Sequence, residues 1–222
     1  MGRILFIGKN SSIWQRLSQD PAWIDGIGPV LGHADVAGFD FQPDDQVWIF
    51  SYSRVNAENI ALFEQLKERG ARQVYYVSTA SSNVMQITSR FTYPRAKSVA
   101  AEAAQRILGA RTVLLGYVVE NLSESPSGWA AIVTLDELSA AMRGYGGSFT
   151  SGAPIRLFTM REAPFRSRLE AVLYHCYFRL AFALGRYVFL LRPVDIILRA
   201  LGYRWYGYFG MSNHLWSTTT SS

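Results

Sequence analysis

The sequence predicts an α/β fold: a doubly wound parallel sheet followed by an unusual C-terminal helical segment. Over residues 1–150, short apolar runs rich in β-branched and aromatic residues alternate with helix-like runs. This alternation is typical of a parallel sheet with helices on its faces. Residues 151–222 differ, since they carry nine arginines, no lysine and only three acidic residues. We therefore expect an α/β domain over residues 1–150, a basic, aromatic-rich helical segment over 151–216 and a disordered tail over 217–222.

The composition limits the class of protein. A chain of 222 residues suits one domain or one domain with an appendage. The single cysteine, Cys176, excludes an internal disulfide and fits a reducing compartment. No basic and apolar leader precedes the strand-like "RILFIG" of residues 3–8, so we expect a cytoplasmic protein. The net charge of +5 comes from the last third of the chain, which indicates an anionic partner for that segment.

The first elements are expected to be a strand, a turn and a helix. Residues 3–8 are a β-rich apolar run, and polar "KNSS" and helix-like "SIWQRLSQ" follow them. Residues 29–36, "PVLGHADV", are a candidate second strand. Residues 45–53, "DQVWIFSYS", are a third, because β-branched and aromatic residues follow an acidic entry.

A helix is expected next over residues 56–71, where Asn56 suits the N-cap and Gly70 stands where a C-cap belongs. Residues 72–82, "RQVYYVSTASS", are the following strand and its exit loop. Polar "KNSS", "SYS" and "STASS" all follow strands. Because ligands bind beyond the carboxyl ends of such strands, these three loops are expected to meet in one crevice.

The remaining elements of the sheet domain are a helix, a strand and a second helix. An alanine-rich helix is expected over residues 93–108, with Pro94 in its first turn. Residues 111–119, "RTVLLGYVV", are the last expected strand, and residues 134–145, "TLDELSAAMRGY", are a short helix.

Residues 93–97, "YPRAK", place a tyrosine and a lysine four positions apart. With twelve tyrosines and three lysines in 222 residues, chance alone gives such a pair in roughly 0.16 of sequences, so its context decides. On a helix, Tyr93 and Lys97 share one face. A nearby ammonium favours the phenolate, which allows the tyrosine to act as a general base and later as an acid.

Four segments in order, "NAENIALFEQLKERGARQVYYVSTASS", "YPRAKSVAAE", "RTVLLGYVVEN" and "TLDELSAAM", resemble landmarks of the extended short-chain dehydrogenase/reductase family. More narrowly, they resemble its NAD-dependent nucleotide-sugar epimerase/dehydratase branch. The resemblance covers residues 1 to about 145. It implies a Rossmann-type dinucleotide-binding domain, NAD or NADP as cofactor and a sugar substrate.

The resemblance also implies roles for individual residues. Thr79, with Ser78 and Ser81 as neighbours, matches the residue that binds the substrate oxygen. Tyr93 matches the catalytic tyrosine, and Lys97 matches the lysine that holds the nicotinamide ribose. The residues expected to bind the cofactor are Gly8, Ser11, Ser12, Asp35, Ser51, Tyr93 and Lys97. No metal site is expected, because no histidine or cysteine has partners at ligand spacing.

The chain departs from the family pattern at three places. The family's first turn has three glycines, whereas "GKNSSIW" keeps Gly8 and has Ser11 and Trp14 at the other two positions. A tryptophan at the third position requires a shifted helix, because glycine there permits close helix–strand packing. The chain between Gly8 and the third strand has room for about one strand where the family has two. Leu115 and Gly116 replace the family's Arg-Pro.

The last third replaces the family's substrate lobe with an apolar, arginine-rich segment over residues 166–210. On a helix over residues 168–192, four basic side chains fall within about 40° of one another: Arg168, His175, Arg179 and Arg186. Two interpretations remain open: the helix is buried against the sheet or in a homodimer, or it lies in an anionic membrane interface. Its arginines and Pro193 argue against a spanning helix. The aromatic run "GYRWYGYFG" resembles interfacial anchors.

The sequence therefore favours an NAD(P)-dependent sugar-modifying enzyme, an epimerase, dehydratase or reductase. Its substrate would be a nucleotide- or lipid-linked sugar in glycan or polysaccharide biosynthesis. The alternative is a non-catalytic Rossmann-fold scaffold or partner protein in membrane-associated glycan synthesis. Nucleic acid is not an expected partner, because the arginine-rich segment is too apolar for an exposed binding face.

Overall fold

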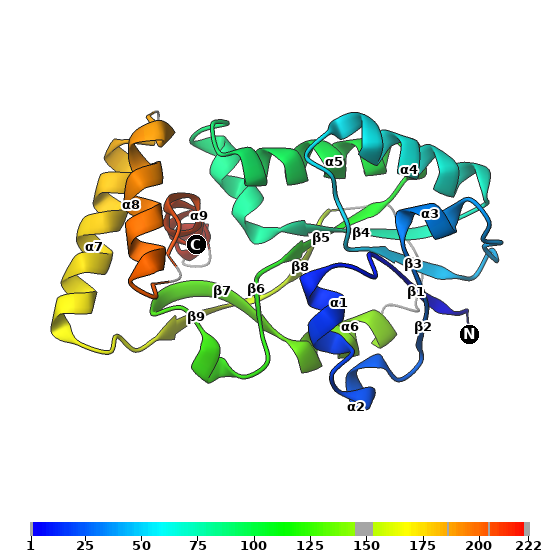
Figure 1. The fold of residues 1–222 in the computed structure, drawn as a ribbon, viewed down its shortest axis with the longest axis horizontal. Helices are drawn as coiled ribbons and strands as arrows, with labels where there is room; N and C mark the ends of the chain where they lie inside the picture. The colour runs from blue at the N-terminus through cyan, green and yellow to red at the C-terminus, as the bar shows by residue number, and fades with distance from the viewer. Residues whose placement is uncertain (1, 145–152, 186, 204, 220–222) are drawn as a thin grey trace.

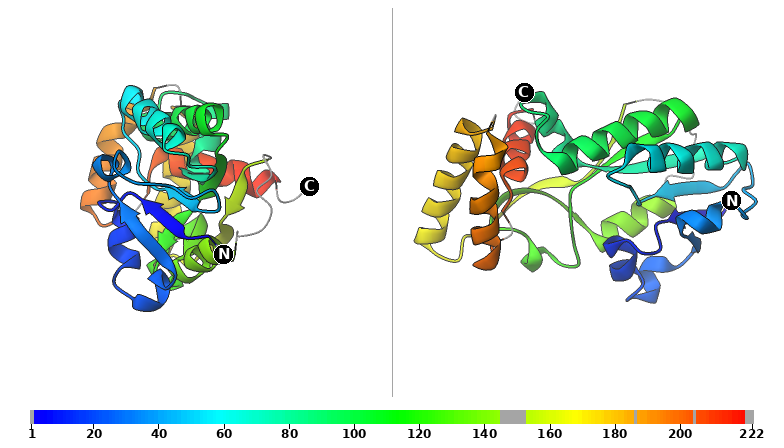
Figure 2. Two further views of the ribbon diagram at one scale, coloured as in Figure 1. Left: turned by 90° about the vertical axis from the view of Figure 1, so that its right-hand side faces the viewer. Right: turned by 45° about the horizontal axis from the view of Figure 1, so that its top comes forward.

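The computed structural model describes residues 2–144, 153–185, 187–203 and 205–219. A large sheet with helices on both faces forms one end of the molecule, and three helices form the other (Figures 1 and 2). These three helices are α7 (Arg168–Ala183), α8 (Val188–Ala200) and α9 (Gly207–Thr219).

The large sheet has six strands in the order β2-β1-β3-β4-β5-β8, and every neighbouring pair is parallel. The strands are β1 (Ile4–Ile7), β2 (Ile27–Leu31), β3 (Gln46–Ile49), β4 (Gln73–Thr79), β5 (Arg111–Leu115) and β8 (Ile155–Leu157). The strand order reverses between β1 and β3, which makes this the topological switch point where such sheets bind ligands.

Helices cover the two faces of this sheet through separate apolar cores (Figure 1). On one face, α4 (Asn56–Glu68) and α5 (Thr92–Leu108) bury Phe63 and Ala100 against strand residues such as Ile7. On the other face, α1 (Ser12–Leu17) and α6 (Leu135–Gly144) pack against strand residues such as Trp48. Successive strand side chains point to opposite faces, so a fully buried strand serves both cores. The predicted doubly wound α/β fold is confirmed.

Between Gly8 and β3 the one strand is β2, as the sequence predicts, and the helices there are α1, α2 (Pro21–Ile24) and α3 (His33–Val36). The strand expected over 29–36 is partly wrong, because β2 ends at Leu31. The Asp35 carboxylate accepts the Gly32 amide hydrogen at 2.8 Å, and this capping contact starts α3 instead.

Two further boundaries differ from the expected ones. Val55, rather than Asn56, is the N-cap of α4, and Asn56 is its first helical residue. Within residues 72–82, where a strand and its exit loop are expected, β4 ends at Thr79 and the exit segment forms a 3₁₀ helix over Ala80–Gln86. This change of direction occurs where the Thr79 hydroxyl accepts the amide hydrogen of Ser81 at 3.2 Å.

The strand expected over 111–119 is divided at Gly116 into β5 and β6 (Tyr117–Val119). A Cβ at Gly116 would lie 2.6 Å from the carbonyl oxygen of Ala131, so only glycine fits this close approach. β6 belongs to a second sheet of order β6-β7-β9, which also contains β7 (Gly128–Thr134) and β9 (Thr159–Ala163). The boundary expected at residue 150 therefore does not separate the sheets, because β6 and β7 precede it and β8 follows it.

The single helix expected over 168–192 is wrong. Helix α7 ends at Ala183, and α8 begins only at Val188. Of the predicted basic stripe, Arg168, His175 and Arg179 lie on α7, and Arg186 lies outside the described residues. None of the helices in the described ranges is long and apolar enough to cross a bilayer.

The first half of the segment expected to be a disordered tail, residues 217–219, is helical. Helix α9 continues to Thr219, and residues 220–222 lie outside the described ranges. Helix α9 packs against both α7 and β7, which ties the end of the chain to the second sheet.

Candidate active site

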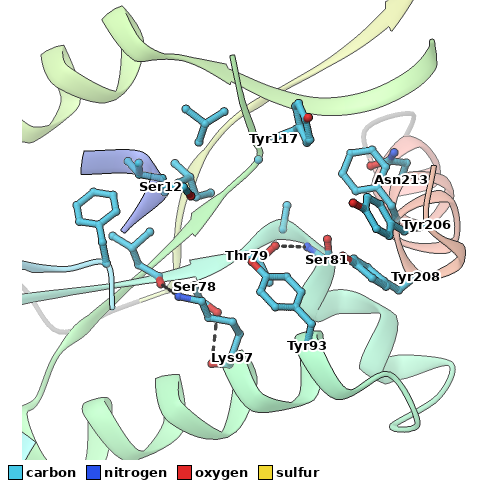
Figure 3. A pocket seen from close by; sticks show the side chains of 18 of the residues that line it. Ser12, Ser78, Thr79, Ser81, Tyr93, Lys97, Tyr117, Tyr206, Tyr208 and Asn213 are labelled. Carbon is cyan, nitrogen blue, oxygen red and sulfur yellow. Dashed lines mark hydrogen bonds between the residues drawn. The ribbon is translucent and has the colours of Figure 1, made fainter. Parts of the chain in front are cut away.

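A pocket of about 540 Å³ lies beyond the carboxyl ends of β4 and β5 (Figure 3). Residues from α1, the β4 exit, α5, the β5–β6 turn and the start of α9 line it. The pocket contains four of the predicted site residues: Ser12, Thr79, Tyr93 and Lys97. The other four, Gly8, Ser11, Asp35 and Ser51, lie outside its lining.

Thr79 and Tyr93 meet at the centre of this pocket (Figure 3). Thr79 is the last residue of β4, and Tyr93 lies in the first turn of α5. Burial and the neighbouring Tyr52 raise the pKa of Tyr93, whereas a hydrogen bond with the Thr79 side chain opposes this rise. Tyr93 is therefore protonated at neutral pH. It keeps 37% of its surface exposed, so its phenol can donate a proton to a bound molecule.

Lys97 lies one helical turn after Tyr93 and is 4% exposed. Its Nζ donates a hydrogen bond to the Val77 carbonyl oxygen at 2.9 Å. The same atom lies 4.4 Å from the ring centroid of Tyr52 and 5.3 Å from that of Tyr76. Burial lowers the pKa of Lys97 to about 7, because a charged ammonium is poorly solvated there.

The aromatic ring of Tyr93 lies between two other tyrosines. Its centroid is 5.8 Å from that of Tyr52 and 5.9 Å from that of Tyr208. Tyr208 is at the start of α9 and also contacts Phe91, with centroids 5.6 Å apart. The C-terminal segment thus supplies a wall of the pocket.

The sequence analysis missed this wall. Tyr206, Tyr208 and Asn213 line the pocket. The sequence signal for the two tyrosines is the aromatic run at 202–210, and no pattern points to Asn213. The interpretation of that run as interfacial anchors is wrong, because Trp205 is 1% exposed and stacks on Tyr203 with centroids 4.3 Å apart. Trp205 belongs to the apolar core of α7, α8 and α9, the three helices that we call the C-terminal lobe, and Tyr203 and Tyr208 pack against this core.

The turn after β1 keeps the conformation that needs glycine. Gly8 has φ +128°, and a Cβ there would lie 3.1 Å from the Ser51 nitrogen. The Ser11 hydroxyl caps α1 by accepting the Trp14 amide hydrogen at 3.1 Å. The Trp14 ring packs on Phe6 with centroids 4.9 Å apart. An indole therefore fills the space between α1 and the sheet where the family's third glycine allows close packing.

Two side-chain contacts join the loops around Gly8. Lys9 forms an ion pair with Asp35 at 2.7 Å, and this contact and the Gly32 amide lower the pKa of Asp35. His33 Nε2 lies 2.8 Å from the Ser51 hydroxyl. Asp35 and Ser51 are thus brought near Gly8 and the switch point, although they do not reach the pocket.

Comparisons with known proteins bear on the fold. No protein-family model and no curated protein matches the chain. Among solved structures, UDP-N-acetylglucosamine 4-epimerase from Bacillus cereus matches with 8% identity and a TM-score of 0.52, over 71% of this chain and 76% of that one. The NAD-dependent NDP-hexosamine 5,6-dehydratase TunA, involved in tunicamycin biosynthesis, matches with 13% identity and a TM-score of 0.50, over 72% and 77%.

The chain therefore has the Rossmann-type fold found in nucleotide-sugar epimerase and dehydratase structures, as its sequence landmarks predict. At such low identities the likeness establishes the fold, and the chemistry has to be argued from the site.

Proposed function

We propose that the protein is an NAD(P)-dependent sugar-modifying enzyme of the short-chain dehydrogenase/reductase kind, an epimerase, dehydratase or reductase. The observation that carries this proposal is the meeting of Thr79, Tyr93 and Lys97 in one pocket beyond the sheet. Thr79 would share the hydrogen bond of a substrate oxygen with Tyr93. Tyr93 would give a proton to that oxygen or take one from it.

Lys97 contributes less positive charge to this site than its spacing from Tyr93 suggests. Its Nζ is bonded to the Val77 carbonyl, and its pKa near 7 leaves the ammonium only partly charged at neutral pH. The tyrosine thus receives little help toward the phenolate, since a neutral amine does not lower its pKa. Tyr93 therefore holds its proton before substrate binds and can donate it, as the reduction of a carbonyl requires.

The chain's residues fit a dinucleotide at both ends of the crevice. Gly8 allows a phosphate to approach the backbone closely, and Ser12 lines the pocket between this turn and Tyr93. Asp35 follows the carboxyl end of β2, where an acid binds a ribose hydroxyl in such folds. Its pair with Lys9 is exposed and contributes little, so a ribose hydroxyl can compete for the carboxylate. When bound, the nicotinamide would accept or supply the hydride.

The walls of the pocket support a sugar carried on a larger group. Tyr117, Tyr206 and Phe209 present aromatic surface, and Ser81 adds a hydroxyl beside Thr79. A pocket with mostly apolar walls and a few polar groups fits a sugar ring beside a stacked base or an apolar carrier. A nucleotide-linked or lipid-linked sugar of glycan biosynthesis is therefore the proposed substrate.

One set of observations favours a non-catalytic scaffold as the second candidate. Lys97 already has a protein partner, Ser11 is used in capping α1, and Trp14 fills the helix–strand space. A protein that no longer binds cofactor would keep the fold with these substitutions.

Calorimetry with NAD⁺, NADH, NADP⁺ and NADPH distinguishes the two functions. We expect one pair of cofactor forms to bind in the micromolar range, and Gly8→Val to abolish that binding, because its φ and the nearby Ser51 exclude a branched side chain. No binding of any form at millimolar concentration would reject the enzyme and favour the scaffold.

A further inference from the structure

The outer helices of the C-terminal lobe expose a large apolar surface. Helices α7 and α8 lie side by side at the end of the molecule, away from the β2 edge of the large sheet (Figures 1 and 2). Their exposed large apolar residues define what we call the α7–α8 surface. They are Leu169, Val172, Leu173, Leu180, Phe189, Leu190, Ile196, Ile197 and, just after α8, Leu201.

These residues lie on the side of each helix that turns away from the core. On α8, Leu191 and Leu198 are buried, whereas Phe189 and Ile196 are 64% and 59% exposed. At 100° per residue the two exposed residues lie within roughly 20° of each other and far from the buried pair. Helix α8 therefore has two apolar faces: one is buried in the core, and the other is exposed.

The charges beside this surface all have one sign. Arg168 and Arg179 on α7, and Arg192 and Arg199 on α8, are exposed. Within the described ranges, no carboxylate lies within ion-pair distance of any of the four.

The two acidic residues of this segment point inward. Glu170 is buried and accepts hydrogen bonds from the Ser127 hydroxyl, at 2.9 Å, and from the Arg166 amide. Asp195 accepts a hydrogen bond from the Tyr177 hydroxyl, and burial raises the pKa of Asp195. The lobe thus presents arginine and apolar side chains to the outside and keeps its carboxylates within.

We propose that the α7–α8 surface binds an anionic lipid bilayer, with the helices lying in the interface. An interfacial helix needs apolar area to bury and cations for lipid phosphates, and this surface supplies both. A second copy of the chain is a poor occupant, because a two-fold contact would place these arginines against each other without acidic partners. The proposal does not depend on the proposed enzyme activity.

Flotation with phosphatidylcholine vesicles, with and without phosphatidylglycerol, tests this. The full chain is expected to float with the phosphatidylglycerol vesicles only, and added salt is expected to weaken the binding by screening. Removing two arginines at about 1 kcal/mol each predicts a roughly thirtyfold weaker partition for Arg192→Gln with Arg199→Gln. The control is Arg69→Gln with Arg72→Gln, two exposed arginines on the large-sheet end, which should bind as the wild type does.

A second variant separates apolar insertion from charge alone. Phe189→Ser with Ile196→Ser should reduce flotation by at least tenfold and leave the melting temperature unchanged, because both side chains are exposed. Three results would overturn the proposal. They are no flotation with phosphatidylglycerol vesicles, flotation that is equal with phosphatidylcholine alone, and a stable dimer in solution that the serine variant dissociates.

Discussion

The ammonium nitrogen of Lys97 is bound to the carbonyl oxygen of Val77, 2.9 Å away, beneath the ring of Tyr52. The contact draws the side chain onto strand β4 and out of solvent. Burial accordingly lowers the pKa of Lys97 from 10.5 to about 7.

This burial predicts an unusual dependence of stability on pH. Between about pH 7 and pH 10.5 the unfolded chain holds a proton on Lys97 that the folded chain lacks. The free energy of unfolding therefore rises with pH across this window. Urea denaturation should show a gain of about 2 kcal/mol from pH 7 to pH 9 in the wild type. Lys97→Met should remove that slope, and an equal slope in the variant would contradict the burial.

Tyr93→Phe tests the acid–base role. Removing one phenol oxygen should lower turnover by about 10²–10⁴-fold on any substrate found, while calorimetric cofactor affinity stays within a few-fold. Tyr187→Phe is the matched control, because Tyr187 is exposed and does not line the pocket. Wild-type turnover in Tyr93→Phe would show that the tyrosine is a structural residue.

Asp35→Ala tests the ribose end of the crevice. Losing a charged acceptor should weaken NAD(H) binding by about tenfold or more. The melting temperature should fall only slightly, because the pair with Lys9 is exposed and the loss is limited to the Gly32 contact that caps α3. Asp44→Ala is a suitable control, since Asp44 lies shortly before the first residue of β3. It is therefore at the amino ends of the strands, whereas the crevice is at their carboxyl ends. Unchanged NAD(H) affinity in Asp35→Ala would place the adenosine elsewhere.

Gly116→Ala tests the join between the two sheets. The added Cβ would lie 2.6 Å from the Ala131 carbonyl and 2.8 Å from the Phe158 side chain. Overpacking of this kind costs about 1–3 kcal/mol, which thermal melting can detect. Gly38→Ala has open space around its Cβ and should melt as the wild type does. Equal melting temperatures for both variants would show that the β5–β6 turn can relax.

Local patterns were sufficient to predict that the large sheet contains strands β1 to β5, although not all of their bounds, and that Thr79, Tyr93 and Lys97 lie close together. Each depends on residues close together in the sequence, such as the apolar run of β1 or the four-residue spacing of Tyr93 and Lys97. The presence of one strand between Gly8 and β3 could also be predicted, because the length of the chain there limits how many elements fit.

The features that were missed depend on contacts between distant parts of the chain. Nothing local shows that Gly116 ends β5, because its cause is the approach of Ala131. Tyr208 lies 115 positions after Tyr93, and only the docking of α9 brings their rings together. The continuous apolar run after residue 168 predicts a helix but not the residue at which it ends. Gly185 lies between α7 and α8, and a single glycine does not interrupt the apolar periodicity of the sequence.

The position of β8 in the large sheet affects how the chain can fold during synthesis. Strands β1 to β5 are complete at residue 115, but the neighbour of β5 is made only from residue 155 onward. During translation there is therefore a stage in which β5 is paired with β4 alone and forms an exposed edge strand. Other chains can associate with such an edge. The wall that Tyr206 and Tyr208 add to the pocket is translated later still. The edge of the large sheet is completed only after residue 157 has left the ribosome, and the pocket only after Tyr208 and Asn213 have followed.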